Sequence, residues 1–368
     1  MFVLDSHCDT PSQLLRLRNP ALDNSHSHVD FPKLERGEVD AAFWALYVPA
    51  SLSADAGMGY AYELLRCVHD ALEKNKDKAS LALSPADAYA NKEKGLFSVF
   101  LALENGAPIG KSLDKLHDFY DAGIRYMTLC HSSDNQICDS CASDVKTWHG
   151  LSPFGKEVVA EMNRMGMIVD VSHISDDSFY DVLECSPVPV VASHSCCRSL
   201  AAHPRNLTDG MIRALAECGG VVQINFFPLF LDSGFADVMK ISGIEERGEA
   251  VERRFIDCPS DDGARKEWYA VLDELEALER PSYRRIVDHI DHVVALAGID
   301  HVGLGSDFDG IAVTPRGMED VSCFPRIFEE MRRRGYSEDD IRKVAGANFM
   351  RVFSDVRTFS SRFSGEVR

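Results

Sequence analysis

Eight short apolar segments, each running into polar residues, recur along this chain of 368 residues and constrain its fold more than any other feature. Their apolar residues are continuous rather than alternating, which is typical of parallel strands covered on both faces. Stretches with helical spacing separate several of them, and Gly166 is suited to end one such helix, residues 155–165. The segments are 2–9, 41–48, 97–105, 125–131, 167–173, 188–195, 220–227 and 301–309.

This alternation predicts an α/β fold, a closed (β/α)8 barrel of the TIM type, formed by a single domain spanning residues 1–368. A doubly wound open sheet is the alternative. It would more often show a glycine-rich phosphate loop after the first strand, and none is present. The tail, residues 336–353, is predicted to be a helix on the barrel exterior, with Ser337 as its N-cap and Asp340 three residues later.

Residues 228–285 interrupt the alternation between the seventh and eighth predicted strands. This insertion is highly charged, and its second half is expected to be helical. Long inserted loops at a barrel mouth often serve function. Two interpretations therefore stay open, a solvated excursion and a lid over the mouth.

Charge and cysteine content restrict the partners and the compartment. The formal net charge of −19 argues against nucleic acid or an anionic membrane surface as the main partner, since both favour basic patches. No apolar run approaches the ~18 residues of a transmembrane helix, and the N-terminus lacks the pattern of a signal peptide. Eleven cysteines in a chain of this size indicate free thiols in a reducing compartment, so a cytoplasmic protein is expected.

Metal-type ligands stand at the carboxyl ends of the predicted strands, where barrel active sites form. A single histidine in such a place is more often structural, but several histidines and acids on different strand ends are hard to attribute to coincidence. Imidazole and carboxylate suit zinc and related divalent ions, and a carboxylate that bridges two ions gives a two-metal site. The residues are His7, Asp9, Glu104, His131, His173, His194, Asp307 and Asp309.

A second cluster contains only cysteines. Cys138 and Cys141 form a Cys-x-x-Cys, and Cys196 and Cys197 are adjacent. A structural zinc needs four such ligands, and a redox dithiol usually starts a helix in a thioredoxin-like unit. Neither context is evident, so ordinary buried or loop thiols are expected.

The ordered motifs "DSHCDT", "LALENG", "MTLCHSSDN", "VDVSHIS", "VVASHSCCRSLAAHPRN" and "HVGLGSDFDG" resemble those of the membrane (renal) dipeptidase family of zinc peptidases, a branch of the amidohydrolase-like barrels. The resemblance runs along most of the chain and is weak in the insertion. It implies a binuclear zinc metallopeptidase that hydrolyses dipeptides and tolerates a D-residue at the C-terminal position. A homodimer also fits the family.

The resemblance also implies a role for each matching residue. His7 and Asp9 bind one zinc ion, His173 and His194 bind the other, and Glu104 bridges both. His131 contacts the substrate and stabilises the oxyanion, Asp307 shuttles the proton, and Arg205 binds the substrate carboxylate. His203 and Asp309 are expected to be structural.

Two other classes of function stay open beside the dipeptidase. One is another binuclear amidohydrolase, of the lactonase or deaminase type. Such deaminases usually open with His-x-His and use one metal, whereas this chain has His7-Cys8-Asp9 and Glu104. The other is a non-catalytic protein on a retained barrel, which predicts lost ligands.

Overall fold

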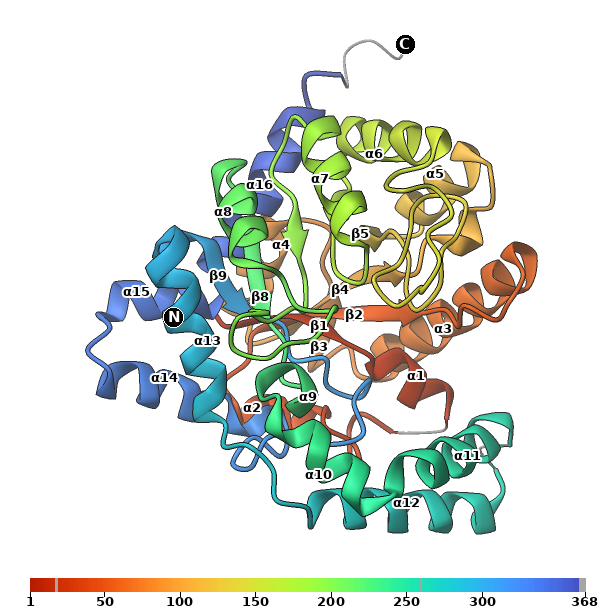
Figure 1. Cartoon of the computed structure of the whole chain (residues 1–368), viewed down its shortest axis with the longest axis vertical. Coiled ribbons are helices and arrows are strands. Elements are labelled where there is room, and N and C mark those ends of the chain that lie inside the picture. Colours follow the sequence, from red (N-terminus) through yellow and green to blue (C-terminus); the bar gives the residue numbers. More distant parts are fainter. Residues whose placement is uncertain (17–18, 259, 364–368) are drawn as a thin grey trace.

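The computed structural model describes residues 1–16, 19–258 and 260–363. Its parallel sheet confirms the predicted barrel, with the path β1-β2-β4-β5-β6-β7-β8-β9 (Figure 1). The circle is closed beyond the last strand, where the backbone N–H of Asp9 donates to the carbonyl of Phe308 at 2.8 Å and that of Asp307 donates to the carbonyl of His7 at 3.0 Å. The strands of this path are β1 (Leu4–Cys8), β2 (Ala41–Tyr47), β4 (Phe97–Glu104), β5 (Ile124–Thr128), β6 (Ile168–Asp170), β7 (Val191–Ala192), β8 (Val221–Ile224) and β9 (Val302–Leu304).

A further strand, β3 (Ala79–Leu81), was not predicted from the sequence. It pairs with the first residues of β4, from Phe97 to Val99, while β5 pairs with β4 from Leu101 onward. Three residues are too few to give a recognisable apolar period. The strand thus extends one side of β4 and is not one of the barrel staves.

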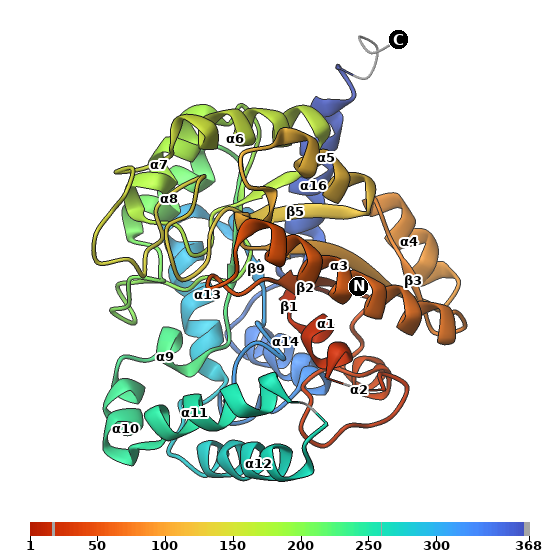
Figure 2. The same ribbon diagram turned by 90° about the vertical axis from the view of Figure 1, so that its right-hand side faces the viewer.

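Helices surround the barrel in the order expected for β/α units (Figures 1 and 2). Gly166 ends α6 in the left-handed conformation with φ 83°, and Ser337 forms a capping box with Asp340, so both predicted helix signals are confirmed. The helices outside the insertion are α1 (Thr10–Leu15), α2 (Phe31–Arg36), α3 (Ala54–Lys74), α4 (Pro85–Glu93), α5 (Leu113–Asp121), α6 (Pro153–Met165), α7 (Asp176–Cys185), α8 (Asp209–Glu217), α13 (Arg284–Ala297), α14 (Phe324–Arg333), α15 (Glu338–Arg342) and α16 (Asn348–Ser360).

The barrel interior is packed by every second side chain of the strands, as a period of two requires. Phe43 of β2 stacks on Phe100 of β4 at a ring-centroid distance of 4.8 Å. Phe349 and Phe353 of α16 pack on Phe43 at 5.1 and 6.1 Å. The tail therefore contributes to the interior core, which a prediction of an exterior helix did not include. On β4 the same alternation places Glu104 on the interior face with Phe100.

The insertion is mostly helical as far as Glu276, beyond the second half predicted from the sequence, and residues 277–283 lead to α13 without helix. Its helices are α9 (Pro228–Leu231), α10 (Gly234–Ser242), α11 (Ile244–Asp257) and α12 (Asp262–Glu276). They share a small apolar core of their own, built around Phe255, Trp268 and Val271. Figure 2 shows α11 beside α1, with α12 farther from the barrel. Within the described part of the chain, no helix is both long and apolar enough to cross a membrane.

Candidate metal centre

The structure brings together, at the carboxyl ends of the strands, the side chains that the sequence analysis singled out as ligands. His7 lies on β1, Asp9 directly precedes α1, and Glu104 is the last residue of β4. His131, His173, His194 and Asp307 follow β5, β6, β7 and β9. Three groups of residues each offer possible ligand atoms, and within each group these atoms all lie within 4.8 Å of one another. The groups are His7, Glu104 and His194; Glu104, His131 and His173; and His7, Asp9 and Asp307.

Glu104 occupies the centre of the cluster because its two carboxylate oxygens face different histidines. Its Oε2 lies 3.5 Å from Nε2 of His7. Its Oε1 lies 3.2 Å from Nε2 of His173, 3.5 Å from Nε2 of His194 and 3.7 Å from Nε2 of His131. A single buried carboxylate thus has a ring nitrogen beside each of its two oxygens.

The orientation of the His7 ring is set by Tyr126, a buried residue of β5. The Tyr126 hydroxyl donates to the carbonyl of Ser6 at 3.1 Å and lies 2.5 Å from Nδ1 of His7. Since its only proton is directed to Ser6, the hydroxyl accepts from Nδ1–H of His7. When the ring is neutral, that tautomer leaves a lone pair on Nε2, which points toward Glu104 and Asp9.

An equivalent chain supports His194. The Ser193 hydroxyl donates to Oδ2 of Asp170 at 2.7 Å and lies 2.7 Å from Nδ1 of His194, from which it accepts. Asp170 is fully buried and also accepts from the hydroxyl of Thr128 at 2.5 Å. Nε2 of His194 is therefore also free to act as a ligand. Tyr126, Ser193 and Asp170 were missed from the sequence, where they look like ordinary interior strand residues.

Two residues of the cluster have a backbone conformation that is uncommon outside glycine. His173 has φ 71° and Asp307 has φ 63°. Non-glycine residues with positive φ are rare and often occur at functional sites. The side chain of Asp307 is oriented by Asn225, which directly follows β8 and donates from Nδ2 to its Oδ2 at 2.9 Å. Asn225 was likewise not found from the sequence.

The surroundings of the four histidines shift the pKa of each imidazole. Burial, reinforced by the positive charge of Arg205, lowers the pKa of His131 to about 3 and the pKa values of His173 and His194 well below their ordinary range. The pKa of His7 is raised although burial opposes this, because Glu104 and Asp9 lie beside it. Three of the four imidazoles are thus held neutral, the state that binds a metal ion.

The pKa values of two acids in the cluster are raised because the two are buried and lie close to other carboxylates. Burial and the charge of Glu104 raise the pKa of Asp9 to about 6. Burial and the charge of Asp9 likewise raise the pKa of Asp307 to about 6. Carboxylates that lie this close together in a buried place repel one another unless cations compensate their charge.

Arg205 lies beside the cluster and is 6% exposed. It donates from Nη1 to the hydroxyl of Ser195 at 2.9 Å and from Nη2 to the carbonyl of His194 at 3.0 Å. Its buried Nε has no hydrogen-bond partner among the described residues. His203 accepts from the backbone N–H of Arg205 at 3.1 Å, in line with the structural role predicted for it.

Asp309 and the cysteines lie outside the three candidate ligand groups of the described residues. Asp309 accepts from the backbone N–H of His28 at 2.7 Å and from the hydroxyl of Thr10 at 3.0 Å, and it lies outside the three ligand groups. All eleven cysteines are free, including Cys138 and Cys141. Cys138 is buried and Cys141 is partly buried, and neither belongs to a ligand group of the described residues.

A cavity of about 260 Å³ opens onto the cluster. Its inner wall includes Asp9, Glu104, His131, His173 and Asp307. Its outer wall is formed by Arg16, at the end of α1, and by Glu252 and Ile256 of α11. The volume suits a small molecule better than a folded polypeptide. The insertion therefore contributes directly to the walls of the cavity.

The donor set fits divalent metal ions. Nε2 of His7 and Oδ1 of Asp9 are buried without a hydrogen-bond partner in the described part of the chain, and both residues belong to the ligand groups. Unpaired buried polar atoms are costly unless something coordinates them. Neutral imidazoles, several carboxylates and hydrogen bonds behind the rings are the arrangement of a metal site. Fold and site together define a barrel-type metallohydrolase.

Comparison with known proteins narrows this class. The family model described as membrane dipeptidase (peptidase family M19) matches residues 1–366. The chain belongs to this family, and so to the metallopeptidases that act on dipeptides.

Individual relatives agree with the family assignment. The dipeptidase aclJ of Aspergillus oryzae is 34% identical over 91% of this chain and 71% of its own. The dipeptidase verJ of Clonostachys rogersoniana is 32% identical over 91% of this chain and 78% of its own. The crystal structure of the probable dipeptidase PvdM from Pseudomonas aeruginosa superposes with a TM-score of 0.83 at 26% identity, covering 98% of this chain and 96% of that one.

Proposed function

We propose that this protein is a binuclear zinc dipeptidase in which Glu104 bridges the two ions. The observation that carries the proposal is the position of the Glu104 carboxylate, with Oε2 toward His7 and Oε1 toward His173 and His194. Asp9 completes the set on the side of His7, 3.5 Å from its Nε2. When bound, such a pair of ions polarises a peptide carbonyl and lowers the pKa of a water molecule toward neutrality.

Asp307 is proposed to handle protons. It lines the cavity, and its Oδ1 is 3.9 Å from Nε2 of His7, so it lies at the edge of the ligand set. Asn225 donates to its Oδ2, and its Oδ1 is the oxygen that faces His7. An ionised Asp307 accepts a proton from the attacking water and returns it to the departing amine.

His131 is proposed to stabilise the oxyanion that forms on the substrate. Its Nε2 is 3.7 Å from Oε1 of Glu104, farther than the corresponding atoms of His173 and His194. A neutral imidazole that carries a proton on the nitrogen facing the substrate is a preorganised donor. The ring is held between Tyr47 at 4.9 Å and His173 at 4.1 Å.

Arg205 is proposed to bind the C-terminal carboxylate of the dipeptide. Its unpartnered Nε and its remaining N–H groups are the support for this role, because an unpaired buried guanidinium N–H calls for an acceptor. Recognition of a free carboxylate distinguishes a dipeptidase from an endopeptidase. Tolerance of a D-residue at that position is part of the same proposal.

The remaining parts of the proposal concern the whole molecule. The eleven free thiols support a cytoplasmic location. The residues that α11 places in the cavity wall support a lid role for residues 228–285 within a single domain. A homodimer is proposed from the resemblance to the family, and measurement of the molar mass in solution tests it.

A metal assay combined with a dipeptide screen tests the proposed function. Protein purified with zinc is expected to contain two ions per chain and to hydrolyse L,L- and L,D-dipeptides, with loss of activity on chelation and recovery on adding zinc. Lactones and aminated nucleobases serve as competing substrates. Hydrolysis of these compounds without hydrolysis of any dipeptide would contradict the proposal.

A further inference from the structure

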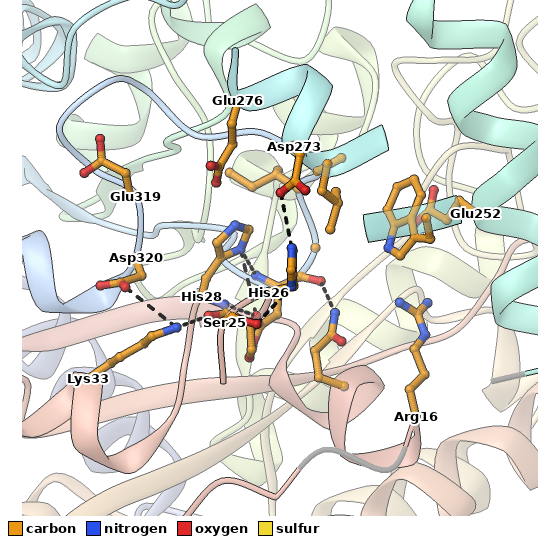
Figure 3. Close-up of a pocket in the computed structure, with 18 residues that line it drawn as sticks. Arg16, Ser25, His26, His28, Lys33, Glu252, Asp273, Glu276, Glu319 and Asp320 are labelled. Carbon is orange, nitrogen blue, oxygen red and sulfur yellow. Dashed lines mark hydrogen bonds and ion pairs between the residues drawn. The ribbon is translucent and has the colours of Figure 1, made fainter. Parts of the chain in front are cut away.

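Arg16 is the feature of the cavity that the proposed mechanism does not use. It is the residue directly after α1 and lines the cavity over the metal centre. It also lines an adjoining cavity of about 250 Å³, formed with α12 and with residues 25–28. The two cavities share Arg16, Glu252, Asp309 and Gly310, so they meet at Arg16. Figure 3 shows Arg16 and Glu252 extending toward the same part of this space from opposite sides.

The guanidinium group of Arg16 has no anionic partner in the part of the chain that the structure describes. Its side chain takes part in none of the hydrogen bonds or ion pairs found there, although the chain has 58 acidic residues against 39 Lys and Arg. What holds it is an aromatic ring, because its Cζ lies 5.6 Å from the ring centroid of Phe255 on α11. Phe255 is 1% exposed. A cation held on a fixed ring face keeps its hydrogen-bond donors available.

Arg16 and Arg205 lie in different parts of the site. Arg205 donates to the backbone of His194, so it lies next to the metal ligands. Arg16 lies seven residues beyond the ligand Asp9 along α1, which is about 10 Å at the helical rise per residue. Two extended residues span only about 7 Å. The backbone of Arg16 is therefore farther from Asp9 than the main chain of a dipeptide is long, and its guanidinium lies beside Phe255 of α11.

We propose that Arg16 recognises a carboxylate on the side chain of the substrate, so that this enzyme prefers acidic dipeptides. The inference rests on the proposed dipeptidase function and specifies its substrate class. A Glu or Asp side chain supplies the extra reach that the main chain lacks. The insertion then serves specificity, since Phe255 positions the guanidinium from α11.

Acids line both cavities: Glu252 and Asp309 line the two of them, and Asp273, Glu276, Glu319 and Asp320 line the adjoining one. None of these acids forms an ion pair with Arg16 in the described structure, and Glu252 has an interaction of its own. Glu252, Phe255 and Ile256 follow the i, i+3, i+4 spacing of one helix face, which is the face of α11 toward α1. Arg16 lines both cavities and has no ion pair in the described structure, so its guanidinium N–H groups are available to a substrate carboxylate that enters this space.

Pairs of matched dipeptides measure the effect of a negative charge on the substrate side chain. The zinc-loaded enzyme is assayed with Ala-Glu against Ala-Gln and with Glu-Ala against Gln-Ala, pairs that differ in charge and hardly in shape. We expect kcat/KM to favour the acidic member of at least one pair by about tenfold, and Arg16→Gln to abolish that ratio. Arg16→Lys should keep part of it, and Arg16→Glu should shift preference toward Ala-Lys. Arg213→Gln, at an exposed position on α8, is the control and should keep the wild-type ratio.

The possible results separate a failure of the Arg16 role from a failure of the proposed dipeptidase function. Equal cleavage of acidic and neutral dipeptides by the wild-type enzyme, or an acidic preference that survives in Arg16→Gln, overturns the role of Arg16 and leaves the dipeptidase function intact. Absence of cleavage of every dipeptide by the zinc-loaded wild type overturns the proposed function itself. If Arg16→Gln does not fold, Phe255→Leu decides, because loss of the ring face should lower the acidic-to-neutral ratio in the same direction.

Discussion

The hydroxyl group of Tyr126 is expected to control metal affinity although it touches no metal ligand atom. In the structure it accepts from Nδ1–H of His7 at 2.5 Å and donates to the carbonyl of Ser6 at 3.1 Å, inside a fully buried part of the barrel. Tyr126→Phe removes this oxygen and keeps the ring. Nδ1 of His7 then has no fixed acceptor, and the proton is free to move to Nε2, the atom that faces Glu104 and Asp9.

The size of the effect follows from these two hydrogen bonds. Removal of a group that fixes the tautomer of a metal-binding histidine typically weakens metal affinity ten- to a hundredfold, which is about 1.4–2.7 kcal/mol. The metal-free protein should also lose stability by about 1–3 kcal/mol, because the carbonyl of Ser6 and Nδ1 of His7 are left unpaired in a buried place.

Competition with a chelator of known zinc affinity measures the first quantity, and urea unfolding of the metal-free protein measures the second. Tyr62→Phe, on the exposed face of α3, is the control and should change neither. Unchanged metal affinity in Tyr126→Phe, with normal folding, would refute the reasoning that Tyr126 sets the tautomer of His7.

Three further predictions follow from other contacts. Asp307→Asn should keep both ions while kcat falls on the order of 10²-fold, since it removes a positioned proton acceptor; a parallel loss of metal and activity would show that Asp307 is a ligand. Amidation of the dipeptide C-terminus should cost about 2–4 kcal/mol in transition-state binding to wild type, and this penalty should largely disappear in Arg205→Met; equal cleavage of free and amidated substrates by wild type would assign Arg205 another role. Hydrogen bonds from Arg333 and Arg334 lower the pKa of Glu330 from 4.5 to about 2, so its contribution to stability is full above about pH 4.5 and is lost as the pH falls toward 2. The difference in unfolding free energy between wild type and Glu330→Gln should therefore shrink from about pH 6 to pH 3, and a constant difference would argue against the ion pairs.

The candidate ligand set could be predicted from the sequence because parallel strands bring their carboxyl ends to one place. His7, Glu104 and His194 each end or follow an apolar run, so pattern and chemistry coincide at the same residues. The capping box at Ser337 and the left-handed Gly166 were found for a similar reason, since each is a local rule with a local signal.

Residues that act through distant contacts gave no such signal. Tyr126 contacts His7 across 119 positions, and Asn225 contacts Asp307 across 82. In the sequence, Tyr126 and Asn225 look like ordinary residues of apolar segments, because only the folded barrel brings them to their partners. Arg16 is similar, because only the packing of α11 against α1 makes it part of the cavity. Strand β3 was not predicted because three residues are too few to show an apolar periodicity.

Metal content of the Glu104 variant tests the central claim most directly. Elemental analysis of protein purified with zinc should find two ions per chain in wild type and in Asp309→Asn, a nearby buried acid outside the ligand groups. Glu104→Ala should lose both ions together, whereas His194→Ala should mainly weaken one. A wild-type protein that firmly binds no zinc, or a Glu104→Ala protein that loses no more metal than His194→Ala, would contradict a binuclear centre bridged by Glu104.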